Sequence, residues 1–196
     1  MKSKIDSFYV KHNCERLTQG DILRDFSFFS IDDSSEYTFQ YIVVVSQDCD
    51  ISFSREQKED KNTQKILYNQ YLPNILFTPA FILSDFKEGK HLKKLFNVEQ
   101  KTFNITDLEK IKDNSKEIRY HYLPYYEDFQ VQDLIIDFKI YFTLSLDKIL
   151  EVYQDKYVAT ISELFRESLS QRFANYISRI GLPIFGDENK SENTPT

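Results

Sequence analysis

YIVVVSQDCDI, residues 41–51, is the stretch that decides how the first half of this chain folds. It belongs to a longer run of β-branched and aromatic side chains, residues 37–46, which follows the loop sequence DDSS at 32–35. Side chains branched at Cβ pack well on a pleated strand, and a continuous apolar run indicates a strand buried on both faces. We therefore expect a core strand over residues 37–46 that ends in a cluster of polar side chains.

The polar end of this strand places Cys49 between two acids, Asp48 and Asp50. In an extended chain Gln47 and Cys49 would point to one face and the two acids to the other. A nucleophilic cysteine needs a lowered pKa, whereas neighbouring negative charges favour the protonated thiol. Cys49 is therefore interpreted as a buried structural residue. A nearby arginine or histidine, such as Arg172 or His121, would favour a catalytic role instead.

The composition limits the size and class of the protein. The chain has 196 residues, of which 41% are hydrophobic, so we expect one core of ordinary size. The net charge of -6 argues against a protein that coats nucleic acid. No glycine-rich phosphate-binding motif occurs among the 4 glycines. We predict a single domain over residues 1–185 and a flexible tail over residues 186–196.

Cysteine usage and hydropathy bear on the cellular compartment. Cys14 and Cys49 are too few for a disulfide scaffold, and neither belongs to a CxxC pair. The first residues contain no apolar signal core, and no segment approaches the length of a membrane span. We expect a soluble cytoplasmic protein with reduced thiols and no membrane contact.

Segments of strand character recur along the chain around one segment of helical character. Apolar and aromatic residues gather over 66–71, 75–81, 117–126 and 134–146, whereas 52–64 is polar and is expected to be an exposed loop. Pro73 and Pro79 favour an edge strand or a broken strand over 75–81. The pattern predicts a mainly β fold of the α+β class, with a barrel-like or curved antiparallel sheet.

The lysine-rich segment 85–116 differs from its neighbours. Thr106 and Glu109 within it have the spacing of a capping box, which indicates a helix start. We expect a small helical insertion over 85–116. Its lysines are interpreted as a solvated surface, and contact with nucleic acid or an acidic partner is the alternative.

The last strong signal is a helix pattern between two boundary motifs. Thr160 and Glu163 form a second capping box, and the sequence GLP at 181–183 is a helix stop. The apolar residues between them recur at the spacing i, i+3, i+4: Ile161, Leu164, Phe165, Leu169, Phe173, Tyr176, Ile177 and Ile180. This spacing predicts a C-terminal amphipathic helix docked on the sheet.

That apolar stripe contains a conflict, because Arg172 falls inside it, with Arg166 and Arg179 near its edges. A guanidinium cannot be deprotonated in a protein, so a buried one must find an acceptor. We expect the acceptors to be the acids at strand ends, Asp21, Asp50 and Asp137. The preferred interpretation is a structural arginine–aspartate lock between helix and sheet. The alternatives are a pocket for phosphate or carboxylate, and arginines that reach solvent.

Taken together, these polar residues form one candidate pocket for an anionic ligand or partner. Its arginines would hold the anion and its acids would orient them. Its members are Asp21, Gln47, Cys49, Asp50, Arg119, Arg172 and Arg179. In an enzymatic alternative His121, in the aromatic strand RYHYLPYY at 119–126, would act as general acid or base.

Metal binding is an alternative role for some of these polar residues. Zinc could use His12, Cys14, Cys49, His91 and His121, but their spacing matches no compact zinc pattern. A divalent ion for nuclease chemistry could use Asp48, Asp50 and Asp137, without the pairing of an acid with Glu-x-Lys on adjacent strands. We therefore expect no metal and no cofactor.

A family resemblance adds to these observations. The sequence QGDIL at 19–23, followed by a loop and IVVVS at 42–46, resembles the opening of the PemK/MazF-like toxins over about residues 17–81. The resemblance implies an SH3-like barrel and, for many members, endoribonuclease activity. That family usually places Arg-Pro before the valine run, where Gln40 and Tyr41 stand here. Only Gly20, Asp21 and Ser46 match family positions, as residues that form the barrel.

The chain is also similar to uncharacterised bacterial proteins from accessory or defence gene clusters. The likeness rests on the CD pair at 49–50, the strand RYHYLP at 119–124 and the ending RIGLP at 179–183. It implies a non-catalytic binding or assembly component of a bacterial defence or toxin-type system, with a protein partner from the same gene cluster. An endoribonuclease-like toxin that acts on RNA is the alternative.

Overall fold

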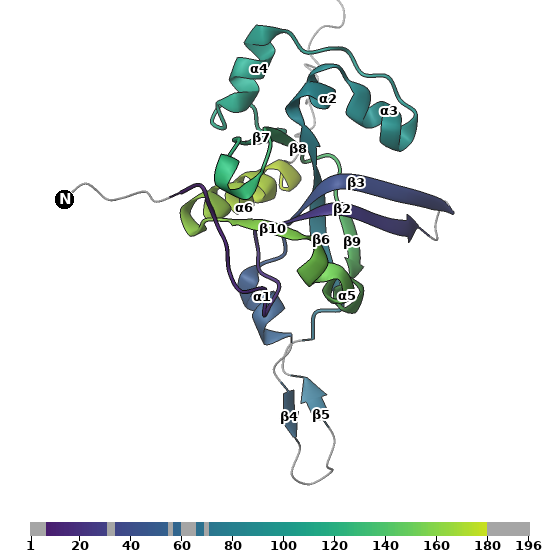
Figure 1. Ribbon diagram of the computed structural model, residues 1–196, viewed down its shortest axis with the longest axis vertical. Helices are drawn as coiled ribbons and strands as arrows, with labels where there is room; N and C mark the ends of the chain where they lie inside the picture. The colour runs from purple at the N-terminus through teal and green to yellow at the C-terminus, as the bar shows by residue number, and fades with distance from the viewer. Residues whose placement is uncertain (1–6, 31–33, 55–56, 60–65, 69–70, 180–196) are drawn as a thin grey trace, which may run out of the picture.

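In the computed structural model, the described residues are 7–30, 34–54, 57–59, 66–68 and 71–179. They form a mainly antiparallel β structure with a curled sheet and several helices, as expected for the α+β class (Figure 1). The main sheet has the order β1-β10-β2-β3-β6-β8-β7, and β9 also pairs with β6. Its strands are β1 Tyr9–Val10, β2 Asp21–Ser30, β3 Ser35–Val44, β6 Asn74–Ile82, β7 Tyr120–Leu123, β8 Leu134–Asp137, β9 Phe142–Ser145 and β10 Tyr157–Ile161.

Strand β3 confirms the expected core strand, and its two faces serve two different cores. Residues 41–45 are all at most 8% exposed. Because successive side chains of a strand point to opposite faces, Val43 and Val45 join one apolar cluster, while Ile42 and Val44 join another. The continuous apolar run is therefore required by burial on both sides of one strand.

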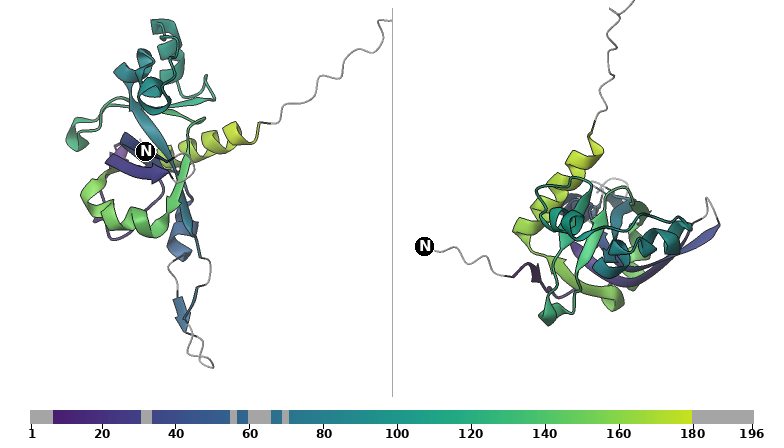
Figure 2. Two further views of the ribbon diagram at one scale, coloured as in Figure 1. Left: turned by 90° about the vertical axis from the view of Figure 1, so that its right-hand side faces the viewer. Right: turned by 90° about the horizontal axis from the view of Figure 1, so that it is seen from above.

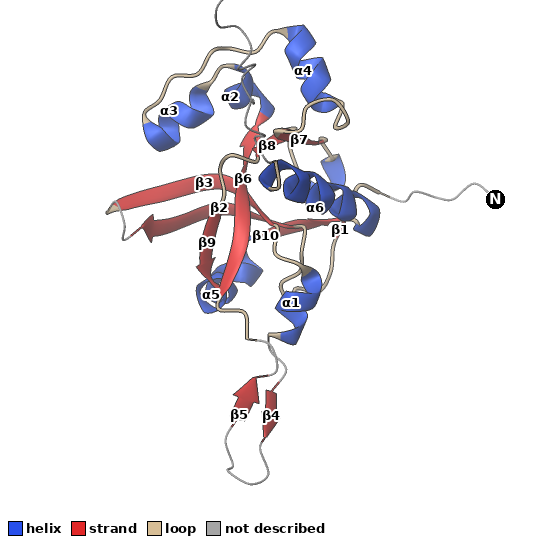
Figure 3. Cartoon of the chain, turned by 180° about the vertical axis from the view of Figure 1, so that it is seen from behind, coloured by secondary structure: helices blue, strands red, loops and turns tan. Residues whose placement is uncertain are grey.

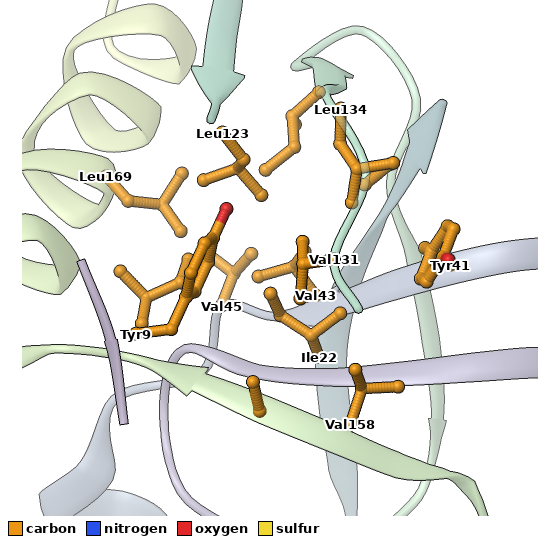
Figure 4. Packing of buried hydrophobic residues seen from close by; sticks show 14 of the residues in the cluster. Tyr9, Ile22, Tyr41, Val43, Val45, Leu123, Val131, Leu134, Val158 and Leu169 are labelled. Carbon is orange, nitrogen blue, oxygen red and sulfur yellow. The ribbon is translucent and has the colours of Figure 1, made fainter. Parts of the chain in front are cut away.

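The first cluster lies between the curled sheet and the long helix α6, Glu163–Ile177. Figure 4 shows Leu169 of α6 opposite Tyr9, Val45 and Leu123, with Tyr41 of β3 on the opposite side of the cluster from Leu169. The hydroxyl of Tyr9 donates to the carbonyl of Pro124 at 2.9 Å, so this buried ring keeps a polar partner.

The second cluster is rich in phenylalanine and lies beneath helix α5, Leu146–Lys156. The third, smaller cluster holds the helices α2 Leu83–Lys87 and α4 Ile105–Lys112 to β7 and β8. Helix α3 Lys90–Phe96 follows α2, and its Leu95 packs against the second cluster. These three helices gather at one end of the molecule (Figure 3). The hairpin of β4 Gln57–Glu59 and β5 Ile66–Tyr68 lies at the opposite end, beyond helix α1, Asp48–Phe53.

Strand β6 corrects one expectation, because it is central although it contains Pro79. On one side Pro79 pairs with Ile42 of β3. On the other side β6 pairs with β9 over residues 74–77 and with β8 over residues 80–82. Pro79 falls in the gap between these two partners, so the missing N–H leaves no ladder hydrogen bond unmade there.

Three further expectations need correction. Residues 48–53 form helix α1 rather than the extended end of a strand or a loop. Residues 146–156 form helix α5, which we did not expect, so the strand pattern over 134–146 covers two short strands and the start of a helix. Helix α6 buries Leu169 and Phe173, but Leu164 in its first turn is 58% exposed. Ile177 is 51% exposed, because the C-terminal end of the helix extends away from the body (Figure 2).

Candidate functional site

The residues expected to share one pocket lie in separate places. Gln47, Cys49 and Asp50 are exposed at the start of α1, and Arg179 is exposed after α6. Asp21 is buried at the start of β2. Arg119 and Arg172 come closer to each other's surroundings, because both contact strand β7 or the residues before it.

Asp21 is the hub of a buried hydrogen-bond network. Its side chain is fully buried and accepts from the Thr18 amide at 2.7 Å and the Thr18 hydroxyl at 2.8 Å. The hydroxyls of Tyr153 and Thr160 donate to it at 2.7 and 2.6 Å, and His12 Nε2 lies 3.1 Å away. Burial, and then the charge of Asp21, raise the pKa of Tyr153, which keeps this donor protonated. The network joins the N-terminal segment, α5 and β10.

His12 uses both ring nitrogens in this network. Its Nδ1 accepts from the amide of Cys14 at 3.1 Å, so the proton of the neutral ring is on Nε2, which faces Asp21. Neither nitrogen is left to take a proton from a substrate. His12 borders an open cleft of about 690 Å³, but its pairing with the buried Asp21 anchors the segment that carries it.

Arg119 provides the arginine–aspartate pair, although with a different arginine from the one expected. Its Nε and Nη2 donate to the two carboxylate oxygens of Asp137 at 2.8 and 2.5 Å. Asp137 is fully buried, and the hydrogen bond to it raises the pKa of Arg119. The guanidinium also lies 4.8 Å from the ring centre of Tyr120. The amide of Lys139 also donates to Asp137 at 3.1 Å, so this carboxylate is fully engaged by its neighbours.

Arg172 pairs with none of the three acids proposed for it. Its Nη2 instead donates to the backbone carbonyls of Glu117 and Tyr120 at 2.5 and 2.6 Å. Strand β7 ends the sheet, and the side chain of Asn114 bonds both the amide and the carbonyl of Tyr122 on this strand. Arg172 and Asn114 thus satisfy backbone groups that no further strand reaches. The expected arginine–aspartate lock is therefore wrong for Arg172, which connects α6 to β7 through backbone carbonyls.

His121 does not reach any surface where a substrate could meet it. The residue is 2% exposed, and neither ring nitrogen has a hydrogen-bond partner among the described residues. Burial, and then the charge of Arg172, lower its pKa to about 3, so the ring is neutral at pH 7. A neutral, covered imidazole is a poor general acid or base.

Cys49 corrects the expectation of a buried cysteine. It is exposed, one residue inside α1, and its Sγ lies 3.6 Å from Oε1 of Gln47. Helix α1 turns residues 48–53 away from the sheet, and only Ile51 of the helix is buried. Asp48 forms an ion pair with Arg16 at 3.0 Å, which ties α1 to the N-terminal segment.

A further cavity lies elsewhere in the molecule, and the sequence did not single out its lining residues as one site. It has a volume of about 250 Å³ and lies between the strands β2, β3 and β6 and the helices α2 and α3. Aromatic side chains and polar groups share its lining: Asp25, Phe39, Tyr41, Phe81, Asp85 and His91. We name it the His91 cavity.

His91 is the most unusual residue of this wall. It is 2% exposed and lies between the rings of Phe81 and Phe86, each 4.7 Å from its own. Neither ring nitrogen has a partner at good hydrogen-bond geometry among the described residues. Burial lowers its pKa to about 4, against smaller opposing effects of Asp137 and the Asp85 backbone. A buried imidazole without a well-aligned partner costs free energy, so its position in the wall of a cavity calls for an explanation.

A second, shallower hollow of about 460 Å³ lies beside the end of α6. Its lining consists of Lys139, Tyr141, Tyr176, Ile177 and Arg179. The side chains of Lys139 and Arg179 have no carboxylate partner among the residues that the structure describes. We name this surface the Lys139–Arg179 hollow.

Metal ligands do not gather anywhere in the described ranges. No group of three or more histidine, cysteine or acidic side chains lies close enough there to hold an ion, so the zinc and divalent-ion sets considered above are not assembled. Among the same residues, no helix has the length and apolar character that crossing a membrane requires.

Comparison with known proteins adds no relative from which a function could be transferred. The chain matches no protein-family model, no curated protein and no solved structure. The resemblance to the PemK/MazF-like toxins therefore stays a prediction from sequence. The candidate site rests on the geometry of this chain alone.

Proposed function

We propose that this chain is a non-catalytic binding protein that holds a small molecule in the His91 cavity. One observation carries the proposal: a partly open cavity whose wall contains a buried histidine without well-aligned hydrogen-bond partners among the described residues. Concave sites that combine aromatic walls with a few polar groups are the usual form of small-molecule sites. At about 250 Å³ the cavity is smaller than a site for a drug-sized ligand, so the ligand is a compact molecule of roughly ten non-hydrogen atoms.

The proposal is tested with three probes of one shape and different charge: benzyl alcohol, benzylamine and benzoate. Ligand-observed NMR should detect at least one of them on the protein, with a dissociation constant on the order of 1 mM. Leu95→Trp places a large ring in the cavity wall and should abolish that binding. Phe96→Trp is the matched control, because Phe96 lies on the same helix, is 40% exposed and does not line the cavity.

Two outcomes would reject the proposal. In the first, none of the three probes binds the wild-type protein. In the second, Leu95→Trp and Phe96→Trp bind the probes equally well, which would place the binding elsewhere.

A second candidate function is supported by the Lys139–Arg179 hollow. Two cations without carboxylate partners lie there beside Tyr141, which is 48% exposed, and Tyr176. Exposed aromatic rings beside cations are typical of surfaces that bind single-stranded nucleic acid. This surface retains Arg179 from the anionic site expected from sequence, in a protein whose net charge of -6 limits the affinity.

Fluorescence anisotropy with a labelled single-stranded RNA tests this candidate. The double variant Lys139→Gln, Arg179→Gln should weaken binding at least tenfold, and Lys148→Gln with Lys156→Gln is the control with the same loss of charge. Equal weakening in both double variants would reject the hollow as the site. The RNA should be recovered intact, and cleavage would favour the endoribonuclease alternative.

We do not extend the proposal to catalysis. The residue expected to act as acid or base, His121, is covered and neutral, and both nitrogens of His12 are occupied. A role in a defence or toxin-type system, and a protein partner from the same gene cluster, stay predictions from the sequence resemblance.

A further inference from the structure

We propose that the ligand of the His91 cavity is an organic cation that carries an aromatic ring, a compact aromatic amine. This inference rests on the proposed binding function and names the ligand class of the same site. The sequence predicted an anionic ligand at other residues, and a cation in this cavity differs from that prediction in both charge and place.

The charges of the cavity wall favour a cation. Among its lining residues are two acids, Asp25 and Asp85, and no lysine or arginine. Asp25 is exposed at the rim, and its carboxylate has no hydrogen-bond or ion-pair partner in the described part of the chain. An anion entering the cavity would meet this charge and lose its hydration without compensation, whereas an ammonium group would pair with it.

Tyr41 reports that the charge of Asp25 acts inside the cavity. Burial raises the pKa of the Tyr41 hydroxyl first, and the negative charge of Asp25 raises it further. Arg24 opposes this effect, but Arg24 does not line the cavity. The carboxylate of Asp25 is therefore close enough to influence a group in the cavity wall.

The aromatic walls suit both parts of such a ligand. Phe39, Tyr41 and Phe81 line the cavity, from strands β3 and β6. The face of an aromatic ring attracts a cation and also packs well against another ring, and both effects grow when water is excluded. His91 is neutral at pH 7, because burial lowers its pKa to about 4, so it adds no repulsion against a cation.

The backbone at Asp25 makes a clean test possible. Asp25 has a φ of 49°, in the left-handed region, within β2. Asparagine adopts this conformation as readily as aspartate, so Asp25→Asn removes the charge and keeps the backbone. Asp50→Asn is the matched control, because Asp50 is an exposed acid on α1 that does not line the cavity.

The experiment compares benzylamine, benzyl alcohol and benzoate on wild type, Asp25→Asn and Asp50→Asn by ligand-observed NMR titration. On wild type, benzylamine should bind about tenfold more tightly than benzyl alcohol, and benzoate should bind most weakly. Asp25→Asn should remove the advantage of the amine and leave the binding of the alcohol unchanged, which also shows that the cavity is intact. Asp50→Asn should change neither.

Each other outcome is informative. If benzyl alcohol or benzoate binds as tightly as benzylamine to wild type, or if the advantage of the amine survives Asp25→Asn, the ligand class is wrong while the binding function stands. If no probe binds, or if Leu95→Trp leaves binding unchanged, the proposed function itself fails.

Discussion

Two buried aspartates, Asp21 and Asp137, solve the same problem in different ways. Both are fully buried at strand ends, Asp21 at the start of β2 and Asp137 at the end of β8. Asp137 is held by one cation, Arg119, through two parallel hydrogen bonds. Asp21 is held by neutral donors from Thr18, Tyr153 and Thr160, together with His12.

The two arrangements differ in how many segments of the chain each carboxylate connects. A single ion pair concentrates the stabilisation in one partner, and removing that partner leaves an uncompensated buried charge. A network divides this stabilisation among several donors. Each donor therefore contributes less, and the other donors still hold the carboxylate when one of them is removed. Asp21 therefore connects more segments, whereas Asp137 depends on one side chain.

The largest effect is expected for Arg119→Ala, which leaves Asp137 buried without its cation. The free energy of unfolding should fall by about 3–5 kcal/mol, measured by urea denaturation. The double variant Arg119→Met, Asp137→Leu should recover most of this loss, because it removes both charges together. A loss below about 1 kcal/mol in Arg119→Ala would mean that water reaches Asp137 and that the pair resembles a surface ion pair.

A smaller effect is expected for Tyr153→Phe, which removes one donor to Asp21 and keeps the ring. Hydrogen bonds to charged groups contribute about 1.5–3 kcal/mol, so the loss should be about 2 kcal/mol. Tyr157→Phe is a control, because that hydroxyl bonds Thr160 and the amide of His12 rather than the charged Asp21, and should matter less. A loss in Tyr153→Phe as large as that in Arg119→Ala would contradict a divided network.

The two aspartates can also be compared with His121, a buried group beside Arg172 whose neutral form is favoured by burial. Its folded pKa of about 3 lies below the unfolded value, so the unfolded chain binds more protons between about pH 3 and 6.5. Stability should therefore be highest above pH 6.5 and fall as the pH is lowered. Keeping this histidine neutral should lower the free energy of unfolding at pH 5 by about 2 kcal/mol relative to its value well above pH 6.5.

Urea denaturation of wild type and His121→Leu at pH 7 and pH 5 measures this contribution. The variant should lose less stability than wild type over that interval, since it lacks the group that must stay neutral. An equal loss in both would show that His121 is protonated in the folded state without penalty.

The smallest effect is expected at Asp50, an acid of helix α1, and its neighbour Cys49. Both are exposed on α1, so Asp50→Asn and Cys49→Ser should each change stability by less than about 0.5 kcal/mol. Cys49 should also react with a thiol reagent faster than Cys14, whose pKa is raised first by burial and then by Asp21. A slow Cys49 would mean that α1 packs against the sheet and that the segment is buried as the sequence suggested.

The sequence predicted the strand over 37–46 because burial on both faces leaves a mark that is local and continuous. It predicted the helical insertion less well in detail: the helix starts at Ile105 after the cap Asn104, whose side chain accepts from Asp107, rather than after Thr106. It missed α5 because Leu146, Ile149 and Tyr153 follow directly on a strand pattern, and the change of period occurs within a few residues.

What the sequence by itself determined is the β3 strand, the mainly antiparallel β character and the need to satisfy a few buried charges. Which groups satisfy them was decided only by the tertiary structure. The donors to Asp21 come from residues 12, 18, 153 and 160, and Arg172 bonds backbone carbonyls, which have no side-chain signature in a sequence. The His91 cavity likewise exists only where α2 and α3 meet β2, β3 and β6. Periodicity records burial along one element, whereas a site depends on contacts between elements that are far apart in the chain.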